Sequence, residues 1–171
     1  MTSRLATLSD IPAIQHTANI AFRHTYRAIL SPEQLDYMMD WMYSTDSLTH
    51  QIADPGKVFF LAEEEGDCIG YASCEPEGTT YDGRPLFHLQ KLYLLPEQQG
   101  KGYGKALVEA VMNHVKESLP YPSHARIELN VNRRNTATAF YERMGMYRDR
   151  QGDFPIGHGY YMNDYIYAID L

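Results

Sequence analysis

The clearest chemical feature of the sequence is a set of three glycines in alternate positions, within LPEQQGKGYGKALVEA at residues 95–110. Gly100, Gly102 and Gly104 separate an apolar run from an amphipathic segment. Glycines allow successive backbone N–H groups to turn toward one point, and a helix beginning here would add free N-terminal donors and the positive end of its dipole. The lysines at 101 and 105 add positive charge. The segment therefore predicts a site for a phosphate or pyrophosphate group.

Two common phosphate-binding motifs do not fit this segment. A P-loop requires a second glycine five residues after Gly100, and a dinucleotide fingerprint requires one three residues after Gly102. Both positions are occupied by Lys105. Taken alone, the glycines are also compatible with a tight connection that binds no ligand.

The segment resembles the acetyl-CoA motif of the GNAT N-acetyltransferase superfamily, Arg/Gln-x-x-Gly-x-Gly/Ala, with Gln99, Gly102 and Gly104 at the matching positions. A second match lies in IELNVNRRNTATAFYERMGM at residues 127–146. There Asn135, Phe140 and Tyr141 fit the family pattern, and Thr138 replaces the usual alanine. The resemblance implies an acetyl-CoA-dependent N-acetyltransferase that uses no metal.

The same resemblance implies where acetyl-CoA binds. In the family, the strand before the glycine turn splays from the next parallel strand at a bulge, and the pantetheine arm fills the gap. Asn135 is equally suited to capping a helix, and Arg143 would reach the adenosine phosphates. The implied cofactor-binding residues are Leu92, Tyr93, Leu94, Gln99, Gly100, Lys101, Gly102, Tyr103, Gly104, Lys105, Asn130, Asn135 and Arg143.

Two residues are candidates for proton transfer. Tyr141 stands where the family often places a general acid, and a phenol titrating near about 10 can protonate a thiolate whose thiol titrates near about 8.5. A packed aromatic is the alternative interpretation. Many relatives carry glutamate at the positions of His88 and Gln90, which share one face of a regular strand. His88 can act as a base, and a water chain to an acid such as Glu75 is the alternative.

The acceptor is predicted from the front of the chain. The segment 24–44 looks like the polyamine-acetylating branch, and Tyr26 and Trp41 are candidate substrate-binding residues beside Asp36 and Asp40. Aromatic faces and carboxylates favour an alkylammonium group, whereas neighbouring arginines would favour an anion. A small primary amine, such as a polyamine, is therefore expected. The alternatives are a peptide or protein acceptor, or a GNAT fold that binds CoA without turnover.

The elements that must position these residues follow from periodicity and capping. Ser31 is expected to cap a helix whose Gln34 closes a capping box. The sequence predicts a single α/β (α+β) domain over 1–171, with a mixed, mostly antiparallel sheet of six to seven strands and helices on both faces. Expected strands are 2–7, a hairpin over 57–76, 86–95, 125–131 and 159–171; expected helices begin near 10, 31, 46, 103 and 135.

Composition limits the remaining possibilities. The 171 residues carry a net charge of −7, which argues against binding a nucleic-acid backbone. Residues 1–85 hold five Lys/Arg against thirteen Asp/Glu. This acidic excess either attracts cationic ligands or has no function beyond an ordinary solvated surface. Neither a membrane-length apolar run nor a secretory signal is present, so a cytoplasmic protein with reduced Cys68 and Cys74 is expected. The family resemblance adds a possible homodimer.

Overall fold

A computed structural model describes residues 1–119 and 124–171. It contains one mixed sheet of seven strands in the order β1-β2-β3-β4-β5-β7-β6, in which only β4 and β5 run parallel. The strands are β1 (Thr2–Leu5), β2 (Val58–Glu64), β3 (Asp67–Thr79), β4 (Pro85–Leu94), β5 (Arg126–Asn132), β6 (Tyr147–Gly157) and β7 (Tyr160–Asp170). The predicted fold class is confirmed.

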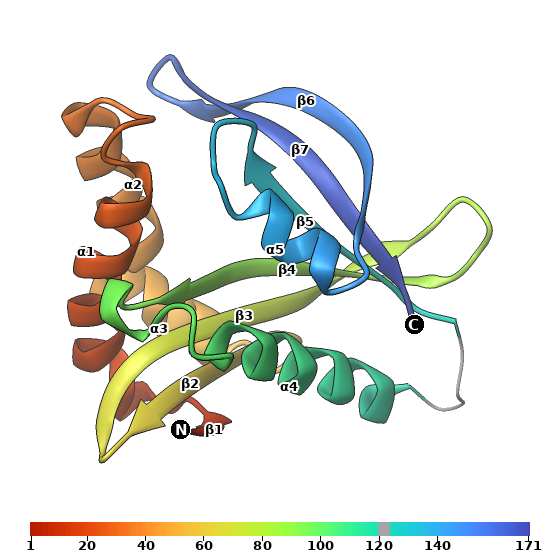
Figure 1. Cartoon of the computed structure of the whole chain (residues 1–171), viewed down its shortest axis with the longest axis horizontal. Coiled ribbons are helices and arrows are strands. Elements are labelled where there is room, and N and C mark those ends of the chain that lie inside the picture. Colours follow the sequence, from red (N-terminus) through yellow and green to blue (C-terminus); the bar gives the residue numbers. More distant parts are fainter. Residues whose placement is uncertain (120–123) are drawn as a thin grey trace.

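Helices cover both faces of this sheet (Figure 1). One face is covered by α1 (Ile11–Tyr26), α2 (Pro32–Tyr43) and α3 (Thr45–Ala53), which pack with the aromatic residues of β2 and β3. The other face is covered by α4 (Tyr103–Ser118) and α5 (Thr138–Arg143). Short 3₁₀ turns, η1 (Leu8–Asp10) and η2 (Pro96–Gln98), precede α1 and α4. The two apolar clusters therefore lie on opposite sides of one sheet.

The helix starts show where local sequence rules hold and where they fail. The Ser31 side chain accepts a hydrogen bond from the Gln34 backbone N–H at 3.1 Å, as predicted. The expected capping box is wrong, because the Gln34 amide instead donates to the Tyr161 carbonyl on β7 at 3.1 Å. The helix expected from Asn135 begins only at Thr138. Asn135 Oδ1 accepts from the Ala137 N–H at 2.9 Å, which forms an Asx turn before the helix.

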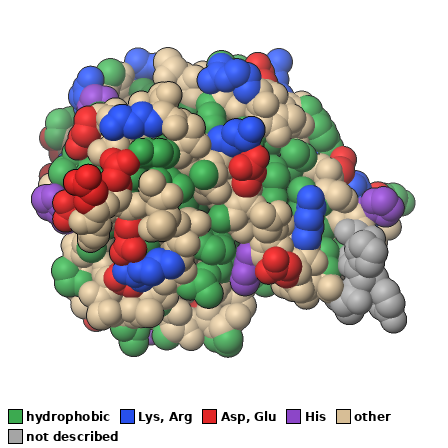
Figure 2. All heavy atoms as spheres, turned by 60° about the horizontal axis from the view of Figure 1, so that its bottom comes forward, with side chains coloured by type: hydrophobic (Ala, Val, Ile, Leu, Met, Phe, Trp, Pro, Cys, Tyr) green, Lys and Arg blue, Asp and Glu red, His purple; other side chains and the backbone are tan. Residues whose placement is uncertain are grey.

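Charged groups of both signs are intermixed on the face drawn in Figure 2. Several front-half carboxylates are already paired, including Asp10 and Glu63 with Arg4, and Asp36 with Arg23. No helix among the described residues is long and apolar enough to cross a membrane. The acidic excess of the front half is therefore partly neutralised by local ion pairs.

Candidate active site

The sheet opens between β4 and β5, because these strands pair over only three positions, Leu86–His88 with Arg126–Glu128. Two residues later β4 contains a bulge: Cys74 pairs with Leu89 and Ser73 with Lys91, so Gln90 is the extra residue. A bulge bends its strand and increases the local twist. Beyond His88, the edge of β4 that faces β5 has no strand partner among the described residues. The splay and bulge expected from the resemblance are both present.

A cleft of about 880 Å³ occupies this opening. Four segments line it: the end of α1, the second half of β4, the glycine turn with the start of α4, and β5 with the loop and α5 that follow it. Of the predicted site residues, it is lined by Tyr26, Leu92, Tyr93, Leu94, Gln99, Gly100, Gly102, Gly104, Lys105, Asn130, Asn135, Tyr141 and Arg143. Residues far apart in sequence therefore meet around one cavity.

The glycine turn delivers backbone donors to one end of the cleft. Gly100 and Gly102 have φ values of +77° and +85°, and Gly102 is the N-cap of α4. A Cβ added at either glycine would meet no described atom within 4 Å, so backbone conformation, not local crowding, requires glycine here. The first N–H groups of α4 precede its first intrahelical bond, from Ala106 N–H to the Gly102 carbonyl. They are free to bind an anion together with the helix dipole.

Two predicted cofactor residues of this turn do not line the cleft. The Lys101 ammonium donates to Gln98 Oε1 at 2.8 Å, and the Tyr103 hydroxyl donates to Glu64 on β2. Lys105 does line it, at 3.7 Å from Glu109. Of the predicted cofactor residues, Lys105 and Arg143 are thus the ones that bring positive side-chain charge to the cleft lining.

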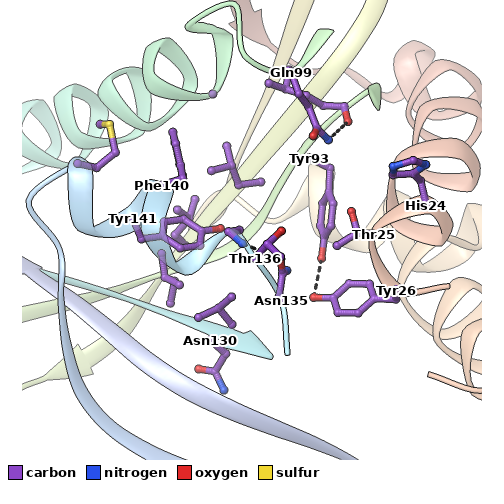
Figure 3. Close-up of a pocket in the computed structure, with 18 of the residues that line it drawn as sticks. His24, Thr25, Tyr26, Tyr93, Gln99, Asn130, Asn135, Thr136, Phe140 and Tyr141 are labelled. Carbon is purple, nitrogen blue, oxygen red and sulfur yellow. Dashed lines mark hydrogen bonds between the residues drawn. The ribbon is translucent and has the colours of Figure 1, made fainter. Parts of the chain in front are cut away.

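Two pairs of aromatic residues face each other across the middle of the cleft (Figure 3). On one side Tyr93 of β4 points toward Tyr26 of α1, with their hydroxyls 3.5 Å apart. On the other side Phe140 and Tyr141 of α5 contact each other edge to face. Burial holds the pKa of Tyr141 well above the ordinary tyrosine value. Its phenol therefore stays protonated at neutral pH and is able to donate.

Behind the cleft lining lies an acid that sequence reasoning missed. Asn130 lines the cleft and donates to Asp164 Oδ2 at 3.2 Å. Asp164 is 4% exposed, its Oδ1 has no hydrogen-bond partner among the described residues, and burial raises its pKa. The available signal was alternation in β7, where Met162, Asp164 and Ile166 share a face and the two apolar members are buried.

The other predicted residues lie away from the cleft lining. His88 Nδ1 is 3.0 Å from Glu77 Oε2, and His88 is not among the lining residues. The assumption that His88 and Gln90 share a regular strand face is wrong, because Gln90 is the bulged residue and alone of the two lines the cleft. Trp41 is half exposed and borders a second cavity, so the structure separates it from Tyr26.

The geometry is that of a protein that binds a long phosphorylated ligand. The mixed sheet is splayed between two parallel strands, and a helix N-terminus lies at one end of the opening. Residues 18–146 match the model of the acetyltransferase (GNAT) family. The chain therefore belongs to the GNAT acetyltransferase family. The expected enzyme class, an acyltransferase, is confirmed at the level of the family.

Sequence relatives agree with this assignment. The chain is 32% identical over 111 residues to YuaI, an uncharacterised N-acetyltransferase of Bacillus subtilis, covering 63% of this chain and 60% of that one. It is 29% identical over 115 residues to YjgM, an uncharacterised N-acetyltransferase of Escherichia coli, covering 67% and 64%. The chain thus spans less than two thirds of the length of either relative.

Solved structures support the fold. A PaiA N-acetyltransferase from Thermoplasma acidophilum, solved with coenzyme A, superposes over the full length of both chains with a TM-score of 0.80 at 21% identity. YncA, a putative acetyltransferase of Salmonella typhimurium solved with acetyl-CoA, gives 0.67 at 22% identity over 100% of this chain and 98% of that one. At such identities the comparison concerns the fold alone.

Proposed function

We propose that this protein transfers the acetyl group of acetyl-CoA to a primary amine of a small molecule. The observation that carries the proposal is the continuity of the cleft, which joins the N-terminus of α4, the open edge of β4 and the end of α1. Acetyl-CoA would supply the activated acyl group. The residues of the chain then have to bind it, admit an amine and manage two protons.

Cofactor binding is assigned mainly to the backbone. The free N–H groups of the glycine turn and of α4 suit the pyrophosphate, with Lys105 and Arg143 adding charge. The unpartnered edge of β4 at Leu92–Leu94 suits the amides of the pantetheine arm, and one of its N–H groups would polarise the thioester carbonyl. Asn130 and Asn135 line the same path from the β5 side.

Proton transfer is assigned to opposite sides of the cleft. As the amine nitrogen bonds to the carbonyl carbon, the carbon–sulfur bond breaks, and Tyr141 gives its proton to the departing sulfur. The amine proton leaves on the other side. The Gln90 amide lines the cleft and donates to Glu75 Oε1 at 2.7 Å, which favours a water-mediated path to Glu75. His88 remains the second candidate. Both groups are already paired, His88 with Glu77 and Glu75 with Lys57, so the support for Glu75 is that its partner Gln90 lines the cleft.

For the acceptor, a polyamine is one hypothesis. Its support is the pair of stacked rings Tyr37 and Trp41 and the exposed Asp40 on α2. Against it, Asp36 is already paired with Arg23, and two lysines lie in the cavity that Trp41 borders. The balance supports a small primary amine as the substrate class and leaves the charge of its remaining part to experiment.

The deciding experiment measures CoA release with a panel of acceptors: spermidine, neutral alkylamines, amino acids and short peptides. Turnover of small amines above the peptides supports the proposal. A clear preference for peptides would replace it with peptide acetylation. Tight acetyl-CoA binding with no turnover of any acceptor would indicate a CoA-binding protein. A cytoplasmic homodimer, expected from the resemblance, is tested separately by cell fractionation and light scattering.

A further inference from the structure

A second cavity of about 240 Å³ lies on the α1–α3 side of the sheet. It is bounded by β2, β3 and β4 and by α2 and α3, and Gln90 lines both this cavity and the main cleft. The bulge therefore brings the second cavity next to the place where acyl transfer is proposed. Its polar and charged lining includes Lys57, Ser73, Glu75, Gln90 and Lys91.

The charges in this cavity do not balance. Lys57 Nζ lies 2.5 Å from Glu75 Oε2, and the other oxygen of Glu75 accepts from Gln90. The Lys91 side chain makes one hydrogen bond, to the neutral Gln51 amide at 2.7 Å, and lies over the Tyr43 ring at 5.8 Å. No carboxylate in the described part of the chain lies within ion-pair distance of Lys91. Two ammonium groups and one carboxylate leave the cavity with one excess positive charge.

The cavity also contains a buried ammonium without a counter-ion and a buried hydroxyl without a hydrogen-bond partner among the described residues. Lys91 is only 8% exposed, and Ser73, its direct cross-strand partner, is 6% exposed. The Ser73 hydroxyl makes no hydrogen bond with any described residue. A buried ammonium normally requires a counter-ion, and a buried hydroxyl normally requires a partner. The two unmet requirements lie side by side on one cavity wall.

We propose that this cavity binds the carboxylate of the acceptor, so that the substrate is a small amine that also carries a carboxylate group, such as an amino acid. The proposal rests on the acetyltransferase function proposed above. Lys91 and the Ser73 hydroxyl would hold the carboxylate, and the amine would extend past Gln90 toward the open edge of β4. One excess positive charge matches a monoanion, whereas a phosphate dianion would be repelled by the neighbouring Glu75.

Protonation of Lys91 gives this proposal a second measurable property. Burial lowers the pKa of Lys91 to about 8; Glu75 raises it and Lys57 lowers it further. The facing groups are thus Lys57 on the β2 side, Glu75 on β3, Gln51 on α3 and Tyr43 on α2. Because the ammonium form is lost as pH rises, carboxylate binding should weaken as pH rises through about 8.

The test compares kcat/KM for glycine, β-alanine and γ-aminobutyric acid with kcat/KM for their carboxamides, with phosphoethanolamine and spermidine as further acceptors. We expect kcat/KM for at least one of the acids to exceed kcat/KM for its carboxamide by about tenfold or more, because the KM of the acid is lower. Lys91→Met and Ser73→Ala should reduce the ratio of kcat/KM for the acid to kcat/KM for its amide. In the unsubstituted protein this ratio should decline above pH 8, and Lys91→Met should remove that decline. Lys116→Met, at an exposed site on α4, is the matched control and should change nothing.

Equal use of acids and amides, an unchanged ratio in Lys91→Met, or a preference for spermidine or phosphoethanolamine would overturn the proposal. Thermal melting checks that each variant is folded, and Lys91→Arg, which keeps the charge, should retain part of the preference. Calorimetry with the N-acetylated acids and their amides decides the question if no acceptor turns over. If the acids then bind more tightly than their amides and Lys91→Met removes the difference, the anion site is supported even though the acetyltransferase proposal fails.

Discussion

The two sides of the cleft are built from different parts of the polypeptide. On the cofactor side, the groups available to a ligand are mainly backbone N–H groups, at the glycine turn, the start of α4 and the edge of β4. On the acceptor side they are side chains from α1–α3 and β2–β5. Of the two buried side-chain atoms without a partner in the described residues, Ser73 Oγ belongs to the second cavity, whereas Asp164 Oδ1 lies behind Asn130 and outside both linings. The cofactor site is therefore a local property of the chain, and the acceptor site is a property of the assembled fold.

The largest effect is expected at Tyr141, which stands at the boundary between the two sides. Tyr141→Phe removes only the hydroxyl, so kcat should fall by about 10²–10⁴ while the affinity for acetyl-CoA hardly changes. Stopped-flow or steady-state CoA release gives kcat, and calorimetry gives the affinity. Normal kcat would show that Tyr141 is a packing residue or that water donates the proton.

A substitution at Gly102 should damage the cofactor side alone. Valine is strained at φ +85° and places a side chain where the ligand approaches, so acetyl-CoA affinity should fall by about 10²-fold, roughly the loss of one or two hydrogen bonds to a charged group. Gly66→Val is the matched control, because Gly66 has φ +92° in the β2–β3 turn and also has open space around its Cβ position. Equal calorimetric affinity in the two variants would refute the assignment.

Asp164 tests whether a carboxylate buried behind the cleft lining destabilises the fold. Because burial raises the pKa of Asp164, protonation of this carboxyl favours the folded state. The resulting stabilisation is complete below the pKa of the unfolded state and is lost as pH rises through the pKa of the folded state. Asp164→Asn should therefore raise the free energy of unfolding at pH 7 by about 1–3 kcal/mol, with a smaller gain in acid.

Denaturant unfolding at two pH values measures this difference, with Asp40→Asn at an exposed position of α2 as control. A loss of stability at pH 7 in Asp164→Asn would show that the carboxylate has a favourable partner in solution.

The smallest effect is expected at Trp41, which borders the second cavity but is half exposed. Trp41→Ala removes an aromatic contact worth about 1 kcal/mol, so the acceptor KM should rise by about fivefold. Acetyl-CoA affinity should stay constant, since Trp41 is absent from the cleft lining. A rise in the KM for acetyl-CoA instead would mean that the two sides are not independent.

This division explains which features the sequence could predict. The glycine turn was predictable because positive φ restricts residue type at fixed spacing. Most strands followed from periodicity, but β6 was not among the expected strands, because its residues are mostly exposed and polar. The acceptor side was harder to predict, since Trp41, Lys57 and Lys91 come together only through the packing of α2 on the sheet and the register of β2, β3 and β4. The start of α5 was misplaced because an Asx turn and a helix N-cap use the same asparagine chemistry.

The bulge in β4 has a consequence for how this strand can vary. Before Gln90, the odd-numbered Phe87 and Leu89 face the α4 cluster; after it, the even-numbered Leu92 and Leu94 do. One extra residue thus inverts the parity of the strand. Deleting Gln90 would restore regular alternation, with Lys91 still on the α1–α3 side and the two leucines still under α4. A one-residue deletion at the bulge is therefore compatible with the packing on both faces of the sheet, and its effect would fall on the bend of β4 beside the cleft.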